Sequence, residues 1–328
     1  MARRSFQVSN VQARVVQGLD RDLIGGDSTC EAILAKQRIS LVLGSGGARG
    51  LAHIGAIRCL EEHDFEIGYI AGSSIGALIG GIYAAGKLDT YTEWVCELQR
   101  RDIMRLLDWS FSHGALFRGE RIMDVLETMV GEHRIEDLPI GFTAVATEIN
   151  DKREVWLNKG PLFDAIRASI AIPLVFAPVE RDGLVLVDGG LINPVPIGPT
   201  LNDETAWTIA VDLNGHAEQI ESAKTTRALS KQKSAGFASK ISAFIDDLLP
   251  KTSRLEPESP GAIELALRSM DTMQTTIARL KLAAYTPKLI IEIPRNLSTF
   301  FEFHRARELI DFGYRRTVAA LETADLKR

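Results

Sequence analysis

Short runs of consecutive apolar residues alternate along the chain with longer stretches in which apolar residues recur every three or four positions. The short runs predict buried strands, and the periodic stretches predict amphipathic helices. The predicted strands are 39–43, 67–71, 141–149, 153–157, 183–187, 207–213 and 288–293, and the predicted helices are 51–63, 75–85, 90–131 with breaks at Gly114 and Gly119, 162–168, 262–284 and 301–324. This alternation indicates an α/β fold with a mainly parallel central sheet and helices on both of its faces.

The pattern also divides the chain. Residues 1–37 lack strong periodicity and are expected to be an N-terminal extension with one short helix at 30–37. Residues 38–328 are expected to form a single domain, because no internal repeat or linker interrupts them. Within that domain, 39–201 carries the motifs described below, and 202–328 completes the fold and includes a polar insertion at 214–260.

Composition excludes two classes of protein. The chain has 38 Lys and Arg against 43 Asp and Glu, a net charge of −5, which argues against a nucleic-acid partner. No apolar run approaches the roughly 18 to 20 residues of a membrane-spanning helix. We therefore expect a cytoplasmic protein whose membrane contact, at the inner face, is peripheral. The three cysteines lack metal-type spacing, and no ligand cluster indicates a metal.

The stretch 72–76, GSSIG, has the form of a nucleophile elbow. It lies between the predicted strand 67–71 and the predicted helix 75–85, so that Ser74 occupies the apex of a sharp strand-to-helix turn. Gly72 and Gly76 would allow the strand and helix to approach closely. The turn also places Ser74 at a helix N-terminus, where free N–H groups favour negative charge.

Two further glycine-rich segments follow predicted strands. Residues 44–50, GSGGARG, follow strand 39–43, and Asp188 with its two glycines follows strand 183–187. Open α/β sheets bind ligands at the carboxyl ends of strands, and acyl transfer needs a nucleophile, a base and donors for an oxyanion. A phosphate-binding loop is disfavoured, because Arg49 and Gly50 stand where a Walker A motif has Gly-Lys-Ser/Thr.

The ordered set of 43–50, 72–76 and 188–190 resembles the patatin-like phospholipase family, in its bacterial and neuropathy-target-esterase branch. The segments 165–173, AIRASIAIP, and 193–196, NPVP, are also similar to bacterial members. The resemblance covers about half of the chain and implies a three-layer α/β/α patatin-like fold. It further implies a serine esterase that hydrolyses lipid acyl esters, of the phospholipase A or lysophospholipase type, without metal or organic cofactor.

The resemblance also implies roles for individual residues. Ser74 would be the nucleophile and Asp188 the base of a catalytic dyad, with the oxyanion held by N–H groups of Gly46 and Gly47. Residues expected to support these motifs are Gly44, Arg49, Gly50, Gly72, Gly76, Gly189 and Gly190. Ser45 departs from the family, which usually has glycine there. A positive φ at this position would strain the loop.

Several alternatives stay open at this point. An α/β-hydrolase esterase or thioesterase would use a triad of Ser74, Asp188 and His216, whose chain order fits that class. A third hypothesis is a catalytically silent lipid-binding module. Arg49 has two interpretations, contact with an anionic group and a salt bridge that fixes the loop, and His53 is expected to be structural.

Two apolar segments bear on the lipid or lysophospholipid substrate. Phe237 to Leu248 has apolar residues at helical spacing near three lysines, which is consistent with a lid, an interfacial helix or a helix packed on the domain. The segment 103–111, IMRLLDWSF, either lines an acyl pocket or packs in the core. Head group, acyl length, positional preference and oligomeric state are left open by the sequence.

Overall fold

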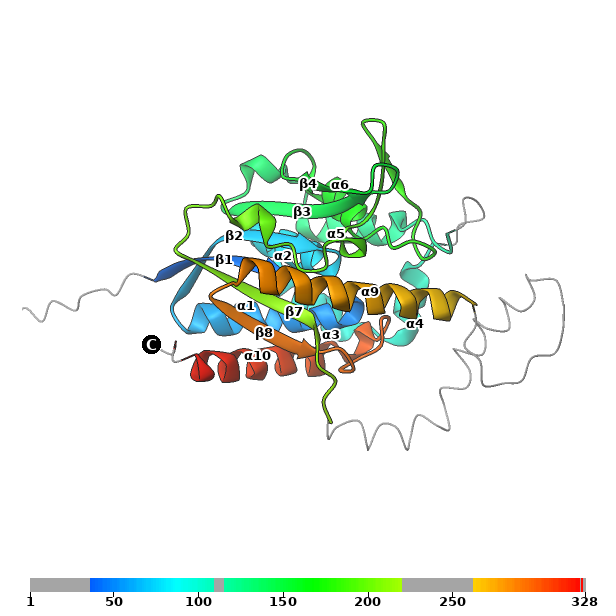
Figure 1. Cartoon of the computed structure of the whole chain (residues 1–328). Coiled ribbons are helices and arrows are strands. Elements are labelled where there is room, and N and C mark those ends of the chain that lie inside the picture. The colour runs from blue at the N-terminus through cyan, green and yellow to red at the C-terminus, as the bar shows by residue number, and fades with distance from the viewer. Residues whose placement is uncertain (1–35, 109–114, 220–261, 325, 327–328) are drawn as a thin grey trace, which may run out of the picture. The chain divides into compact units, whose positions relative to one another are not determined.

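The seven predicted strands and one that the sequence pattern does not predict, β5, assemble into one eight-stranded sheet in the order β5-β6-β3-β2-β1-β7-β8, with β4 paired to β3 off this path (Figure 1). The computed structural model describes residues 36–108, 115–219, 262–324 and 326. The strands are β1 (Gln37–Leu43), β2 (Phe65–Ser73), β3 (Gly141–Glu148), β4 (Arg153–Leu157), β5 (Val179–Arg181), β6 (Leu184–Asp188), β7 (Trp207–Gly215) and β8 (Leu289–Pro294). The described residues, which begin at Lys36, belong to one compact unit. The segment 237–249 lies outside the described residues.

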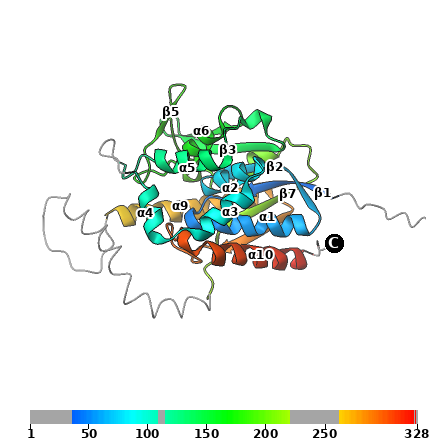
Figure 2. The ribbon, with the colours of Figure 1, turned by 180° about the vertical axis from the view of Figure 1, so that it is seen from behind.

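Helices cover both faces of this sheet. They are α1 (Ala52–Glu62), α2 (Ile75–Ala84), α3 (Leu88–Glu97), α4 (Arg100–Leu106), α5 (Glu120–Val130), α6 (Leu162–Ser169), α9 (Ala262–Tyr285) and α10 (Ala306–Thr323). Alternate residues of β1 show the two layers: Leu41 and Leu43 pack in the core shared with α1, α2 and α10, whereas Val42 packs with Ala278 and Leu282 of α9. Figure 1 accordingly shows α9 in front of the sheet, and Figure 2 shows the opposite helical layer. The three-layer α/β/α prediction is confirmed.

Most strands of the sheet are parallel, as the sequence predicts. β1 pairs in parallel with β2 and β7, β2 with β3, and β7 with β8. The antiparallel part comprises β4 and β6 on β3, and β5 on β6. A turn at 149–152 joins β3 to β4 as an antiparallel hairpin.

Strands β2 and β6 lie end to end along one edge of β3. β4 pairs with β3 over Ala144–Glu148 and so occupies the other edge of this stretch. On the shared edge, Ser73 of β2 pairs with Val145, and Asp188 of β6 pairs with Ala146. Because β2 is parallel to β3 and β6 is antiparallel, the two strands run toward each other and their carboxyl ends meet.

Several element boundaries differ from the sequence prediction, most clearly at three places. Most of the helix expected over 30–37 lies outside the described residues, and Gln37, its last residue, begins β1 instead. The stretch 90–131 contains α3, α4 and α5, and Gly119 precedes α5 with a φ of 80°. The last helix begins at Ala306 rather than at residue 301, and Phe301 and Phe303 instead line a cavity.

Candidate active site

Ser74 lies at the turn between β2 and α2, with φ 56° and ψ −123°. Such a conformation is uncommon for a residue with a Cβ and is retained only where the surroundings enforce it. Here the Ser74 N–H donates to Ser169 Oγ at 2.9 Å, and that hydroxyl donates to the Val145 carbonyl at 2.6 Å. Gly76 allows the helix to lie against β1, because a Cβ there would come within 2.0 Å of the Leu43 carbonyl oxygen.

Ser169 lies within the 165–173 segment and has a role that its local sequence does not indicate. Its function as the acceptor for the elbow depends on α6 ending beside β3 and β2, which a local pattern does not reveal. Ser169 is fully buried, and its hydroxyl joins the nucleophile turn to the middle of β3.

Asp188 is in direct contact with Ser74. The Ser74 hydroxyl donates to Asp188 Oδ2 at 2.5 Å, and the N–H of Gly190 donates to Asp188 Oδ1 at 2.6 Å. The Asp188 residue is 2% exposed. Burial raises the pKa of its carboxyl group to about 7, although the hydrogen bonds from Ser74 and Gly190 oppose that rise.

The glycine-rich loop begins where β1 ends and is held by backbone hydrogen bonds. The N–H groups of Gly44 and Ser45 donate to the carbonyls of Val211 and Pro194, at 3.1 Å and 2.8 Å, and that of Ala48 donates to Phe300 at 2.9 Å. None of these bonds uses the N–H groups of Gly46 or Gly47, the two predicted oxyanion donors. Gly47 has a φ of 58°, lines the same cavity as Ser74 and begins a short 3₁₀ helix, Gly47–Leu51.

Ser45 is accommodated without backbone strain. Among the described non-glycine residues, those with positive φ do not include Ser45. Its side chain lies against Gly190 instead, where an added Cβ would come within 2.3 Å of Ser45 Oγ. The departure from the family's usual glycine is therefore compensated by close packing against the segment that follows Asp188.

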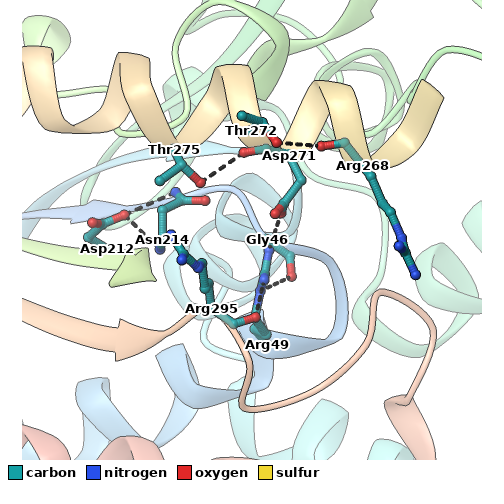
Figure 3. Close-up of polar contacts among 9 residues, drawn as sticks. All are labelled: Gly46, Arg49, Asp212, Asn214, Arg268, Asp271, Thr272, Thr275 and Arg295. Carbon is teal, nitrogen blue, oxygen red and sulfur yellow. Dashed lines mark hydrogen bonds and ion pairs between the residues drawn. The ribbon is translucent and has the colours of Figure 1, made fainter. Parts of the chain in front are cut away.

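Two buried basic side chains, those of Arg49 and His53, hold the glycine-rich loop through hydrogen bonds to its carbonyl groups. Arg49 is 7% exposed; its Nε donates to the Gly46 carbonyl at 3.1 Å, and it forms an ion pair with Asp271 of α9 at 3.0 Å (Figure 3). His53 is fully buried, and its Nε2 donates to the Gly44 carbonyl at 2.9 Å. Burial lowers the pKa of His53 to about 4, which keeps the ring neutral. These contacts favour the structural interpretation of both residues.

His216 does not join the pair. It follows β7 in the chain and its side chain is exposed, whereas the side chain of Asp188 is engaged by Ser74 and Gly190. Within the described ranges there is also no group of three or more His, Cys, Asp and Glu residues placed to bind a metal ion. Every described helix is too short or too polar to span a bilayer.

An apolar cavity of about 130 Å³ lies beside Ser74. Helices α2, α3, α4 and α5 form most of its wall, and segments 170–176 and 300–303 complete it. The lining residues are Gly47, Ser74, Ile75, Leu78, Tyr91, Trp94, Val95, Leu98, Ile103, Leu106, Leu107, Ile122, Met123, Leu126, Ile170, Ile172, Phe176, Phe300, Phe301 and Phe303. The described part of the 103–111 segment thus contributes to a pocket at the serine.

Comparison with known proteins identifies the class of protein to which this fold and this serine–carboxylate pair belong. Residues 41–201 match the patatin-like phospholipase family. An uncharacterized NTE family protein of Mycobacterium tuberculosis is 39% identical over 333 residues, which cover 88% of this chain and 92% of the relative. The chain belongs to the patatin-like phospholipase family, in its NTE group, and this membership supports a hydrolase that acts on lipid acyl esters.

More distant proteins share parts of the chain or its fold. Lysophospholipase NTE1 of Yarrowia lipolytica is 31% identical over 189 residues, 55% of this chain and 13% of that protein. The crystal structure of VipD from Legionella pneumophila has a TM-score of 0.52 at 14% identity and covers 88% of this chain and 67% of that one. The second likeness concerns the fold alone.

Proposed function

We propose that this protein hydrolyses the carboxyl esters of lysophospholipids or phospholipids through a dyad of Ser74 and Asp188. The observation that carries the proposal is the 2.5 Å hydrogen bond to a buried carboxyl group from the hydroxyl of Ser74, which lines an apolar cavity. Ser74 Oγ attacks the ester carbonyl while Asp188 takes its proton. Asp188 then gives this proton to the leaving alcohol, and an acyl-serine remains. In the second half of the reaction Asp188 takes a proton from water, which attacks the acyl-serine, and the proton returns to Ser74 Oγ as the fatty acid leaves.

The developing oxyanion needs donors on the side of the carbonyl that faces away from Asp188. The N–H groups of Gly46 and Gly47 serve this purpose in the proposal, because the bonds that hold the loop use the N–H groups around them. Gly47 and Ser74 line the same cavity, which supports their action on one substrate carbonyl. Preorganised donors of this kind contribute about 10² to 10³ each to turnover.

The cavity indicates which part of a lipid lies next to Ser74. Its wall is formed by apolar side chains, and the charged side chains of α4 are not among its lining residues. We assign this cavity to the acyl chain, whose burial contributes about 0.8 kcal/mol per methylene. The polar head group then stays at the entrance, as the lysophospholipase activity in the name of the Yarrowia relative would require.

A panel of defined lipids tests the proposal. Purified protein is incubated with lysophosphatidylcholine, diacyl phospholipids, a triacylglycerol and a water-soluble peptide ester, and products are measured by mass spectrometry. We expect free fatty acid from the first two classes, with glycerophosphocholine as the second product of lysophosphatidylcholine and a lysophospholipid as the initial second product of a diacyl phospholipid. The peptide ester should turn over slowly. Release of phosphorylated head group without fatty acid, or selective peptide ester hydrolysis, would contradict the proposal.

The pKa of Asp188 predicts the pH dependence of this reaction. The ionised carboxylate is the base, and its raised pKa of about 7 means that the inactive, protonated form predominates at lower pH. We expect kcat/KM for a short soluble ester to rise through about pH 7 and then level off, whereas an aspartate near its ordinary pKa of about 3.9 would give a plateau above about pH 5.

The same profile is measured with His216→Ala, because His216 is the histidine of the alternative triad. The rise near pH 7 should remain in this variant if Asp188 is responsible. Loss of the rise in His216→Ala, or a flat wild-type profile from about pH 5 to about pH 9, would reject the assignment.

A further inference from the structure

We infer that Asp271 of α9 is a positioning residue for the oxyanion loop and acts on it through Arg49. The inference rests on the proposed function, since it concerns the donors that would stabilise the oxyanion. Asp271 lies outside residues 41–201, which match the family, and 222 positions from its partner in the chain. Figure 3 shows Asp271 pointing from α9 toward Arg49, with Gly46 on the other side of the guanidinium.

The peptide group between Gly46 and Gly47 connects Arg49 to catalysis. Its carbonyl oxygen accepts from Arg49 Nε at 3.1 Å. A trans peptide is planar and its C=O and N–H bonds point in opposite directions, so a contact that fixes the oxygen also fixes the direction of the Gly47 N–H. Arg49 thereby orients one of the two proposed oxyanion donors without touching the substrate.

Asp271 in turn fixes Arg49. The guanidinium group donates to three acceptors from different segments: the Gly46 carbonyl, the Arg295 carbonyl at 2.5 Å and the Asp271 carboxylate at 3.0 Å. Only the last carries a charge. Arg49 is 7% exposed, and a buried guanidinium held by carbonyls alone lacks a compensating anion. Asp212, the other carboxyl group in Figure 3, accepts hydrogen bonds from the backbone N–H and the side-chain amide of Asn214. Burial raises the pKa of Asp212, which favours its neutral form, although the charge of Arg49 opposes that rise.

Helix α9 is attached to the sheet independently of this ion pair. Ala278 and Leu282 pack with Val42 of β1, and Lys281 forms an ion pair with Glu154 of β4 at 2.6 Å. Removal of the Asp271 charge should therefore loosen the guanidinium and the Gly46–Gly47 peptide while α9 remains in place. This separates a positioning effect from loss of the fold.

The test is Asp271→Asn, which keeps the size of the side chain and removes its charge. We expect kcat to fall by about 10-fold to 100-fold with KM unchanged, because the oxyanion forms only in the transition state. An alkylboronic acid forms a tetrahedral adduct with the serine and places an oxygen where the oxyanion would be, so its affinity should fall by the same factor. The pH at which the rate rises should not move, since Asp188 is untouched.

Asp311→Asn is the matched control. Asp311 pairs with Arg315 on α10 at 2.9 Å, and its carboxylate is 64% exposed, so the same chemical change removes an ion pair away from the loop. Rate and boronate affinity should stay within about twofold of the wild type. Asp271→Glu, which retains the charge, should recover most of the lost turnover.

Two results would overturn the role of Asp271: an unchanged kcat in a folded Asp271→Asn protein, or a lower kcat with unchanged boronate affinity. If Asp271→Asn proves unstable, the Asp271→Glu protein provides the test. A folded Asp271→Glu protein whose kcat is about 10-fold or more below that of the wild type would also overturn the role of Asp271. These failures are distinct from failure of the proposed function. That function fails if wild-type lipid hydrolysis survives Ser74→Ala, whatever the behaviour of the Asp271 variants.

Discussion

Ser74→Ala is expected to lower turnover of lipid esters by about 10³ to 10⁶, because removal of a covalent nucleophile leaves only binding and oxyanion stabilisation. The substitution deletes a single oxygen from a residue that is 3% exposed, so the fold should persist. A fluorophosphonate probe, which reacts with activated serines, should label the wild type and not the variant. Labelling and hydrolysis are measured on the same preparations.

Ser73→Ala is the matched control for this experiment. Ser73 is the preceding residue, is fully buried at the end of β2 and is paired in the sheet with Val145. It loses the same oxygen atom in the same turn, yet it makes no hydrogen bond to Asp188. Labelling and turnover should therefore remain close to wild type. Retained labelling in Ser74→Ala, or its loss in Ser73→Ala alone, would show that another serine is the nucleophile.

Asp188→Asn is expected to lower turnover by about 10³ or more, since an amide of nearly the same shape cannot accept the Ser74 proton. The Asp188 carboxyl group accepts a hydrogen bond from the Ser74 hydroxyl at 2.5 Å. Burial raises the pKa of Asp188 to about 7, so that its carboxylate can act as a base near neutral pH. Steady-state kinetics on a lysophospholipid and on a short soluble ester should show the same loss. A loss confined to the lipid would indicate a role in binding instead.

His216→Ala distinguishes the dyad from a triad. Its side chain is exposed after β7, and we expect the variant to retain most of its turnover. A fall of about 10³ or more in a folded His216→Ala protein would reject the dyad and favour the triad, with Asp188 as the residue that orients the histidine. The pH profile of the same variant provides the independent check described above.

The local motifs could be read from the sequence because their physical requirements are short-range. A strand, a GSSIG turn and a helix within 19 residues define an elbow, and the glycines reflect contacts that a Cβ would prevent, as at Gly76 against Leu43. Apolar runs and helical periodicity likewise predicted a sheet with helices on both faces. A strand buried on both faces has a continuous apolar run, and a helix buried on one face has apolar residues every three or four positions. Ser45, which stands where the family usually has glycine, also does not have a positive φ.

Tertiary structure alone decided how these pieces meet. Periodicity does not encode strand direction, so the antiparallel β6 that brings Asp188 head-on toward the end of β2 was not foreseeable. The same holds for Ser169, which reaches Ser74 from 95 residues away, and for Asp271, which reaches Arg49 from 222 residues away. Such contacts depend on the packing of whole elements, because hydrogen bonds between distant residues impose no spacing on the chain. The sequence therefore determined the chemical groups and their local turns, and the packing of distant elements determined their partners.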